Sequence, residues 1–192
     1  MLHEISIKIV DFLLKHGTAP KNRSIYIYGT ECFLSECIGN VLLFAVALPL
    51  HQGTSMLIWL LSFLSIRTHL GGYHAPTHWL CLIISTLVGI GSLFFNWIWT
   101  KLGMYSILVL ILCDGYIIFT KAIMHPNHPI STSKSKRERC ILLINTAVES
   151  IIIFIFIYLQ NNWYAPIISG IFCAVLMSLM AKISFLSKNL QY

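Results

Sequence analysis

The chain has 192 residues, of which 57% are hydrophobic and only 10% are charged, and its formal net charge is +6. An ordinary globular protein carries about 25% charged residues, so this composition excludes a typical soluble protein and predicts an integral membrane protein. A membrane-spanning helix takes about 20 residues. The apolar segments therefore leave little room for a separate soluble domain, and we expect a single integral membrane domain over residues 1–192.

The first 15 residues alternate charged and apolar side chains without a continuous apolar stretch and cleavage site, so we expect no signal peptide. Apolar residues recur here at helical spacing, and the charged residues lie largely off their stripe. The stripe consists of Leu2, Ile5, Ile9, Phe12 and Leu13. We expect an amphipathic helix lying in the membrane surface; a short helix packed on the other helices is the alternative.

Six apolar runs follow, near residues 25–50, 54–66, 79–99, 103–124, 140–159 and 164–186. The second run is shorter than the roughly 20 residues that cross a membrane, and it is predicted to be re-entrant or tilted. The sequence thus predicts an all-α fold, a polytopic membrane helical bundle of about six transmembrane or re-entrant helices after the N-terminal helix.

Lysine and arginine gather in alternate connections between these runs. Such residues are in excess on the cytoplasmic side of a membrane protein. They precede the first run and fill the loop after the fourth, whereas the loops at 51–53 and 160–163 carry none. We therefore expect both termini and the loops at 67–78 and 125–140 to face the cytoplasm, with Lys101 as the one minor exception.

The loop at 126–139 begins with proline-containing turns and ends in a basic cluster. The cluster consists of Lys134, Lys136, Arg137 and Arg139. Basic residues beside anionic lipid contribute about 1 kcal/mol each, so these residues could serve only to anchor the topology. The alternative is a docking surface for an acidic segment of a substrate.

Two carboxyl groups, those of Asp114 and Glu149, fall within predicted spans. An ionised side chain at the centre of a membrane helix costs at least about 2.5 kcal/mol. These side chains should therefore be neutral, paired or turned toward a polar interior. We assign neither to catalysis.

The segment 67–81 holds three histidines and a cysteine between two apolar runs. Polar groups at the edge of a hydrocarbon layer are costly unless they are paired or wetted, so their clustering indicates a functional site. An imidazole beside a thiol raises the thiolate fraction, and the two groups together provide a nucleophile and a general acid–base. The segment is therefore a candidate for nucleophilic catalysis.

On one straight helix, His74 and Cys81 would lie about 10.5 Å apart along the axis, too far for proton transfer. Pro76 disfavours a helix at the residue before it, so we expect the helix to begin at Pro76 or Thr77. His74 then lies on a turning segment that can fold back over the first turns of the helix. The glycine pair at 71–72 supplies the positive backbone angles for this return.

Spacing does not by itself select His74, because His69 and His78 are also candidates for the base. The three histidines and Cys81 would also make a four-ligand set suited to zinc. These spacings fit no zinc signature, and no carboxylate is placed to act as a general base. We expect no metal and no other cofactor.

A distinctive pattern runs through this segment: Arg67, Gly71-Gly72, His74-Ala75 and Cys81. Together with the membrane-spanning layout and the proline-bearing basic loop, it resembles the AgrB family, accessory gene regulator protein B, of bacterial quorum-sensing peptidases. The resemblance covers nearly the whole chain in organisation. It implies a cysteine endopeptidase of the bacterial cytoplasmic membrane, with its active site facing the cytoplasm.

By position, Cys81 resembles the family's nucleophile and His74 its base, while Arg67, Gly71 and Gly72 match positions that support the site. The implied substrate is a short AgrD-type precursor peptide. Its acidic C-terminal part is cut off through a Cys81 thioester, which a cysteine of the peptide then attacks to form a cyclic thiolactone. The resemblance further implies contact with membrane lipids and a homodimer; we expect no nucleic-acid partner.

Two other classes of function fit the same residues. A small transporter or exporter could line its permeation path with the polar segment, and it would stay active after Cys81→Ser because transport needs no nucleophile. A metal-dependent membrane hydrolase could use the histidine-rich segment 69–81, and it would lose activity with chelators. Thiol alkylation separates these alternatives from a cysteine peptidase.

Overall fold

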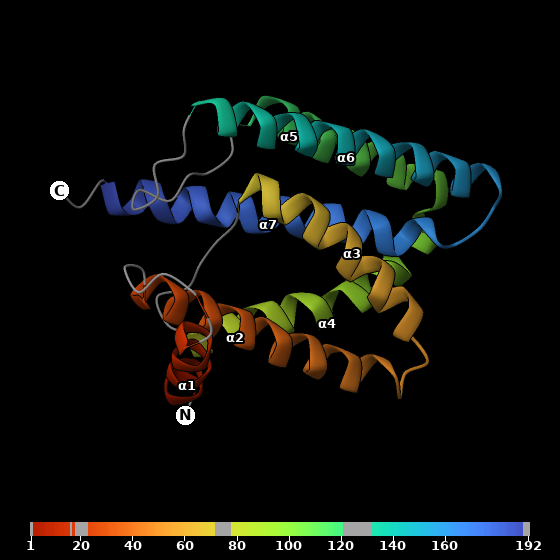
Figure 1. The fold of residues 1–192 in the computed structure, drawn as a ribbon. Coiled ribbons are helices and arrows are strands. Elements are labelled where there is room, and N and C mark those ends of the chain that lie inside the picture. The colour runs from red at the N-terminus through yellow and green to blue at the C-terminus, as the bar shows by residue number, and fades with distance from the viewer. Residues whose placement is uncertain (1, 16, 18–22, 72–77, 121–131, 190–192) are drawn as a thin grey trace.

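A computed structural model describes residues 2–15, 17, 23–71, 78–120 and 132–189, and all regular secondary structure in these ranges is helical (Figure 1). The α-helices are, in chain order, α1 (Leu2–Lys15), α2 (Arg23–Ala47), α3 (Gly53–Leu70), α4 (His78–Leu102), α5 (Ser106–Phe119), α6 (Thr132–Tyr158) and α7 (Tyr164–Asn189). A short 3₁₀ helix, η2 (Gly103–Tyr105), joins α4 to α5. The prediction of an all-α helical bundle is confirmed.

Four stretches of the described helices are long and apolar enough to cross a membrane. They are Arg23–Ala47, Leu82–Phe119, Ser135–Tyr158 and Tyr164–Ser184. The second comprises most of α4 together with η2 and α5, and its chain turns back at Gly103, where φ is +55°. It therefore forms two helices that run in opposite directions on the two sides of α7 (Figure 1).

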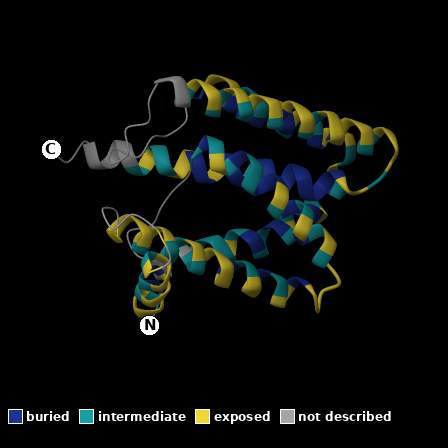
Figure 2. Ribbon diagram, viewed as in Figure 1, coloured by how far each residue is buried: buried dark blue, intermediate teal, exposed yellow. Residues whose placement is uncertain are grey.

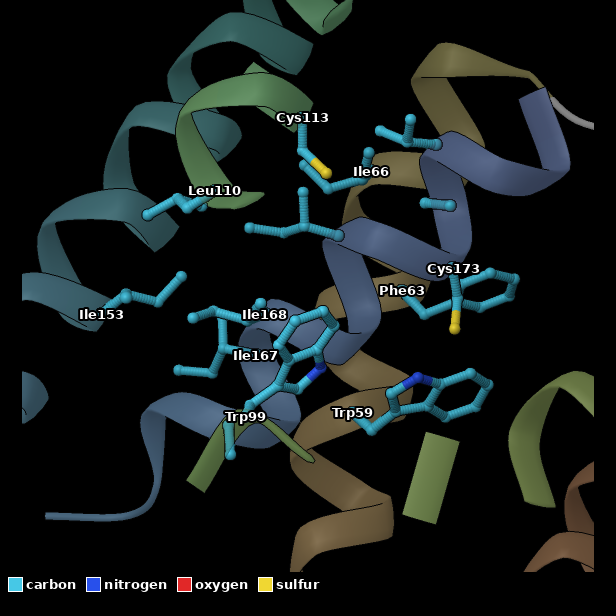
Figure 3. Packing of buried hydrophobic residues seen from close by; sticks show 14 of the residues in the cluster. Trp59, Phe63, Ile66, Trp99, Leu110, Cys113, Ile153, Ile167, Ile168 and Cys173 are labelled. Carbon is cyan, nitrogen blue, oxygen red and sulfur yellow. The ribbon is translucent and has the colours of Figure 1, made fainter. Parts of the chain in front are cut away.

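Helix α7 is the centre of the bundle, because α3, α4, α5 and α6 all pack against it. Helices α5 and α6 lie on one side of α7, while α2 and α4 lie on the other (Figure 1). The first half of α7 is almost entirely buried (Figure 2). Side chains from α3 pack on it, and the rings of Trp59 and Phe63 stack with centroids 4.9 Å apart (Figure 3).

Two helices differ in length from the predicted apolar runs. Helix α3 has 18 residues and continues past the predicted end at residue 66 to Leu70. Helix α5 has only 14 residues and ends at Phe119, where Thr120 becomes extended with φ −88° and ψ 134°. The guanidinium of Arg139 donates to the carbonyl oxygens of Ile118 and Thr120, and so satisfies groups that a longer helix would have bonded internally.

Helix α1 lies crosswise to the long axes of the other helices and packs on the first part of α2 (Figure 1). Arg23 of α2 donates to Oδ1 of Asp11 through Nε at 3.0 Å and Nη2 at 2.9 Å. Ser6 of α1 is buried, whereas Ile5 and Ile9 from the predicted apolar stripe are exposed. The helix thus packs on α2 by one face and presents apolar residues on another.

Helix α4 begins beside the middle of α2. A Cβ placed on Gly39 would lie 3.2 Å from Cδ1 of Leu82, and one on Gly89 would overlap the side chain of Leu43. Gly39 lies about 24 Å along α2 from Arg23. The start of α4 is therefore recessed from the start of α2.

Gly170 lets α7 approach α3 closely. A Cβ on Gly170 would lie 2.6 Å from Oγ of Ser62 and 2.9 Å from the backbone nitrogen of Phe63. We expect Gly170→Ala to lower the free energy of unfolding by about 1–3 kcal/mol, because the added Cβ would clash with the backbone of α3, and a change of side-chain rotamer cannot relieve that clash. Thermal unfolding in detergent measures this. Gly115→Ala is the matched control, because a Cβ at that helical glycine meets nothing within 4 Å; equal melting temperatures for the two variants would contradict the prediction.

Candidate functional site

The predicted nucleophile lies in the first turn of α4. Cys81 is the fourth residue of this helix, which begins at His78 in the described part of the chain. His74 and Gly72 lie outside the described residues, as do Pro76 and Thr77 and the side chains of His78 and Cys81. The pairing of His74 with Cys81 therefore stays a prediction.

Helix α3 directly precedes this segment, and the end of the helix is well defined. Gly71 has φ +78°, and its N–H donates to the carbonyl oxygen of Arg67 at 3.0 Å. A positive φ suits glycine because a Cβ would be strained there. The predicted need for a positive backbone angle is confirmed at Gly71.

Arg67 sits one turn before this end. Its guanidinium carbon lies 5.4 Å from the centroid of the Phe63 ring, and Phe63 in turn stacks on Trp59 inside the bundle. An arginine held over an aromatic face is attracted by the ring quadrupole and keeps less freedom than an arginine in water. The conformation of Arg67 is thus partly fixed by the core.

His69 makes a contact that the sequence did not predict. Its Nδ1 lies 2.7 Å from Oε2 of Glu138, near the start of α6. This histidine was an alternative base and a member of the possible zinc set; it instead joins α3 to α6. No group of three or more histidine, cysteine or acidic residues that could hold a metal occurs among the described residues. The other predicted zinc ligands are the side chains that lie outside them.

The basic cluster divides into two kinds of residue. Lys136 and Arg137 are exposed near the start of α6, where a charged partner could reach them. Arg139 is only partly exposed and uses its guanidinium on the carbonyl oxygens at the end of α5. The side chain of Lys134 lies outside the described part. Of the cluster, Lys136 and Arg137 are thus the described residues best placed for docking.

Comparison with protein-family models matches residues 6–180 to AgrB, Accessory gene regulator B. The chain belongs to the AgrB family. The match runs from α1 to α7 and covers nearly the whole chain, so the resemblance inferred from the pattern at 67–81 is confirmed. No curated protein and no solved structure matches the chain. The protein is a membrane protein of the AgrB family.

The two carboxyl groups predicted to be neutral, paired or turned toward a polar interior in this AgrB-family protein accept hydrogen bonds from serines. Ser62 donates to Oε2 of Glu149 at 2.6 Å, and Ser65 donates to its Oε1. Ser150 donates to Oδ2 of Asp114 at 2.8 Å. The sequence did not reveal the partners on α3, although two serines three residues apart in an apolar run were a signal, because such a pair lies on one face of a helix.

Glu36 is a further carboxylate that no sequence pattern singled out. It is exposed on α2, one turn before Gly39, and shares the helix stripe of Gly39 and Leu43, which faces α4. Along α2 it lies about 4.5 Å before the level of Gly39, and Leu82 directly follows Cys81 in α4. This AgrB-family protein therefore carries an exposed carboxylate at nearly the level of its predicted nucleophile.

Proposed function

We propose that this protein is a membrane-embedded cysteine endopeptidase that removes the acidic C-terminal part of an AgrD-type precursor peptide in quorum sensing. The observation that carries the proposal is the family match over residues 6–180, which includes the whole segment with Arg67, His74 and Cys81. The placement of Cys81 near the start of the described part of α4 supports it, because the positive end of a helix dipole favours a thiolate.

The proposed reaction has two steps. His74 accepts the proton of the Cys81 thiol, the sulfur attacks a peptide carbonyl, and the C–N bond breaks as His74 returns the proton to the leaving amine. A cysteine thiol of the precursor then attacks the resulting thioester. This exchange forms the thiolactone and regenerates Cys81. Because hydrolysis of a thioester is strongly downhill, the site must keep water from the intermediate.

We propose that the active site faces the cytoplasm, with both termini on that side. In support, the ends of α3, α5 and α7 and the starts of α4 and α6 lie at one end of the bundle, away from the loop that follows α2 (Figure 1). Most lysines and arginines are at this end, whereas Lys101 lies at the other. The exposed apolar residues of α1 support contact with membrane lipids, and the family resemblance supports a homodimer.

The test uses a synthetic precursor taken from the reading frame beside the gene for this chain, with an amphipathic start, a central cysteine and an acidic end. The purified protein is reconstituted in vesicles that contain phosphatidylglycerol, and products are identified by mass spectrometry. We expect a released acidic fragment and a peptide that has lost water relative to its linear form. A thiol-alkylating reagent should stop the reaction, and a chelator should not.

Two results would overturn this proposal. Processing that survives alkylation but stops with a chelator would indicate a metal-dependent hydrolase. Movement of intact precursor across the vesicle membrane without cleavage would indicate a transporter.

The exposed part of the basic cluster leads to a separate prediction. We expect Lys136→Gln with Arg137→Gln to raise KM for the precursor several-fold, with kcat nearly unchanged, because charge at this place serves binding only. The effect should shrink at high salt, since exposed charges are screened. Lys101→Gln removes an exposed charge at the other end of the bundle and is the control. An equal change in KM for that variant, or a loss confined to kcat, would refute docking here.

A further inference from the structure

Helices α3 and α6 are joined by polar contacts at two levels, which we call the polar seam. At the deeper level, Glu149 accepts hydrogen bonds from Ser62 and Ser65, and Asn145 donates to the backbone oxygen of Ser65 at 3.3 Å. At the other level, nearer the segment 67–81, His69 contacts Glu138. The seam thus ties the helix before the catalytic segment to the helix that begins with the basic cluster.

The deeper level also engages α7. The hydroxyl of Ser62 lies 3.1 Å from the backbone oxygen of Ile167 as well as 2.6 Å from Oε2 of Glu149, so one donor serves acceptors on two helices. Beside it, Gly170 allows the backbone of α7 to approach α3. Helix α3 is therefore held at this depth by α6 and α7 together.

The two levels are far enough apart to define an axial register. Along α6, Glu138 and Glu149 are separated by about 16.5 Å, and along α3, Ser62 and His69 by about 10.5 Å. Leu142, which is fully buried, lies between Glu138 and Asn145 on α6. The spacing of these α6 residues is that of a single helix face.

Membrane helices do not need such groups in order to pack, because apolar faces associate through close contact and small residues. Apolar faces of similar shape can also pack one turn out of register. A carboxyl that meets two hydroxyls cannot, because a shift would leave buried polar groups without partners. The seam therefore adds specificity of position, with only a modest gain in stability expected from such hydrogen bonds.

We propose that the polar seam fixes α6 and its basic cluster relative to α3 and α7, against which the helix of Cys81, α4, also packs, and so determines which peptide bond Cys81 attacks. This inference rests on the proposed function. A precursor whose acidic tail is held at Lys136 and Arg137 presents to Cys81 the bond that lies at the corresponding distance. An extended chain advances about 3.3–3.6 Å per residue, and one helical turn is about 5.4 Å. A slip of one turn would move the cut by one or two residues.

Glu149 acts here as a positioning residue, and the test reads the site of cleavage as well as the rate. The same precursor is incubated with wild type, Glu149→Leu and Glu149→Gln, and the masses of the acidic fragments are determined. We expect one fragment from wild type and from Glu149→Gln, because the amide oxygen can accept from one serine while the amide NH2 donates to the hydroxyl oxygen of the other. We expect additional fragments, longer or shorter by one or two residues, from Glu149→Leu.

Asp114→Leu is the matched control, because it removes a carboxyl that pairs with α6 from α5 and lies outside the seam. It should give the wild-type fragment. If Glu149→Leu does not fold, the double variant Ser62→Ala with Ser65→Ala removes the donors from α3 and should give the same additional fragments.

The proposal is overturned if folded Glu149→Leu, or the folded double variant Ser62→Ala with Ser65→Ala, yields only the wild-type fragment, whatever the rate of cleavage. Additional fragments from Asp114→Leu as well would also overturn it, because the seam would then not be their cause. Failure of the proposed function would look different, since the wild type itself would then release no fragment or would release it after alkylation.

Discussion

Replacing Cys81 with alanine is expected to abolish processing of the precursor, with a loss of at least about 10³-fold in the rate of cleavage. Under the proposed mechanism, every later step passes through the thioester, so removal of the sulfur leaves no route to the product. Cys81→Ser should also be inactive for thiolactone formation, because an imidazole-activated thiol is a far better nucleophile at neutral pH than a hydroxyl. Time courses by mass spectrometry measure both variants.

The chain offers good controls for Cys81. Cys37 on α2 and Cys140 on α6 are exposed free cysteines, so their variants show whether alkylation outside Cys81 contributes to inhibition. Cys37→Ala and Cys140→Ala should process the precursor at the wild-type rate and remain sensitive to alkylation. Wild-type activity in Cys81→Ser would favour the transporter alternative and reject covalent catalysis at this residue.

Replacing His74 with alanine is the second change with a large expected effect. We expect cleavage to slow by about 10²–10⁴-fold, the usual contribution of a positioned general acid–base. Alkylation of Cys81 by a small reagent should slow as well, because its thiolate fraction falls without the imidazole partner. Stopped-flow or quenched alkylation followed by mass spectrometry separates this effect from substrate binding.

The competing histidines serve as controls for His74. His78→Ala should keep most activity if the base is His74, and a loss confined to His78→Ala would move the role to that residue. His69→Ala removes the contact with Glu138, so it should alter the distribution of fragments more than the reactivity of Cys81. The three variants thus distinguish a base from a positioning residue.

The helices could be predicted from the sequence because each apolar run is local. Their ends could not, since they depend on partners elsewhere in the chain. Helix α3 continues through Arg67 and His69, which are polar, because one stacks on Phe63 and the other contacts Glu138. Helix α5 stops early where Arg139, twenty residues beyond Phe119 in sequence, meets its last carbonyl oxygens.

The candidate site likewise has features that local sequence predicts and features that depend on distant partners. Local rules were enough to anticipate the positive backbone angle at Gly71, because glycine acts on its own backbone. The partners of Glu149 were out of reach, since Ser62 lies 87 residues away. Glu138, Asn145 and Glu149 share one face of α6, but nothing local in the sequence indicates that this face lies against α3.

The recessed start of α4 bears on which polypeptides could reach Cys81 under the proposed function. A chain that reaches the level of Gly39 passes about 24 Å of α2 and the crosswise α1. Under that function, we expect an extended strand adsorbed to lipid to reach Cys81 more readily than a compact globular domain, so folded proteins with acidic tails should be poor substrates.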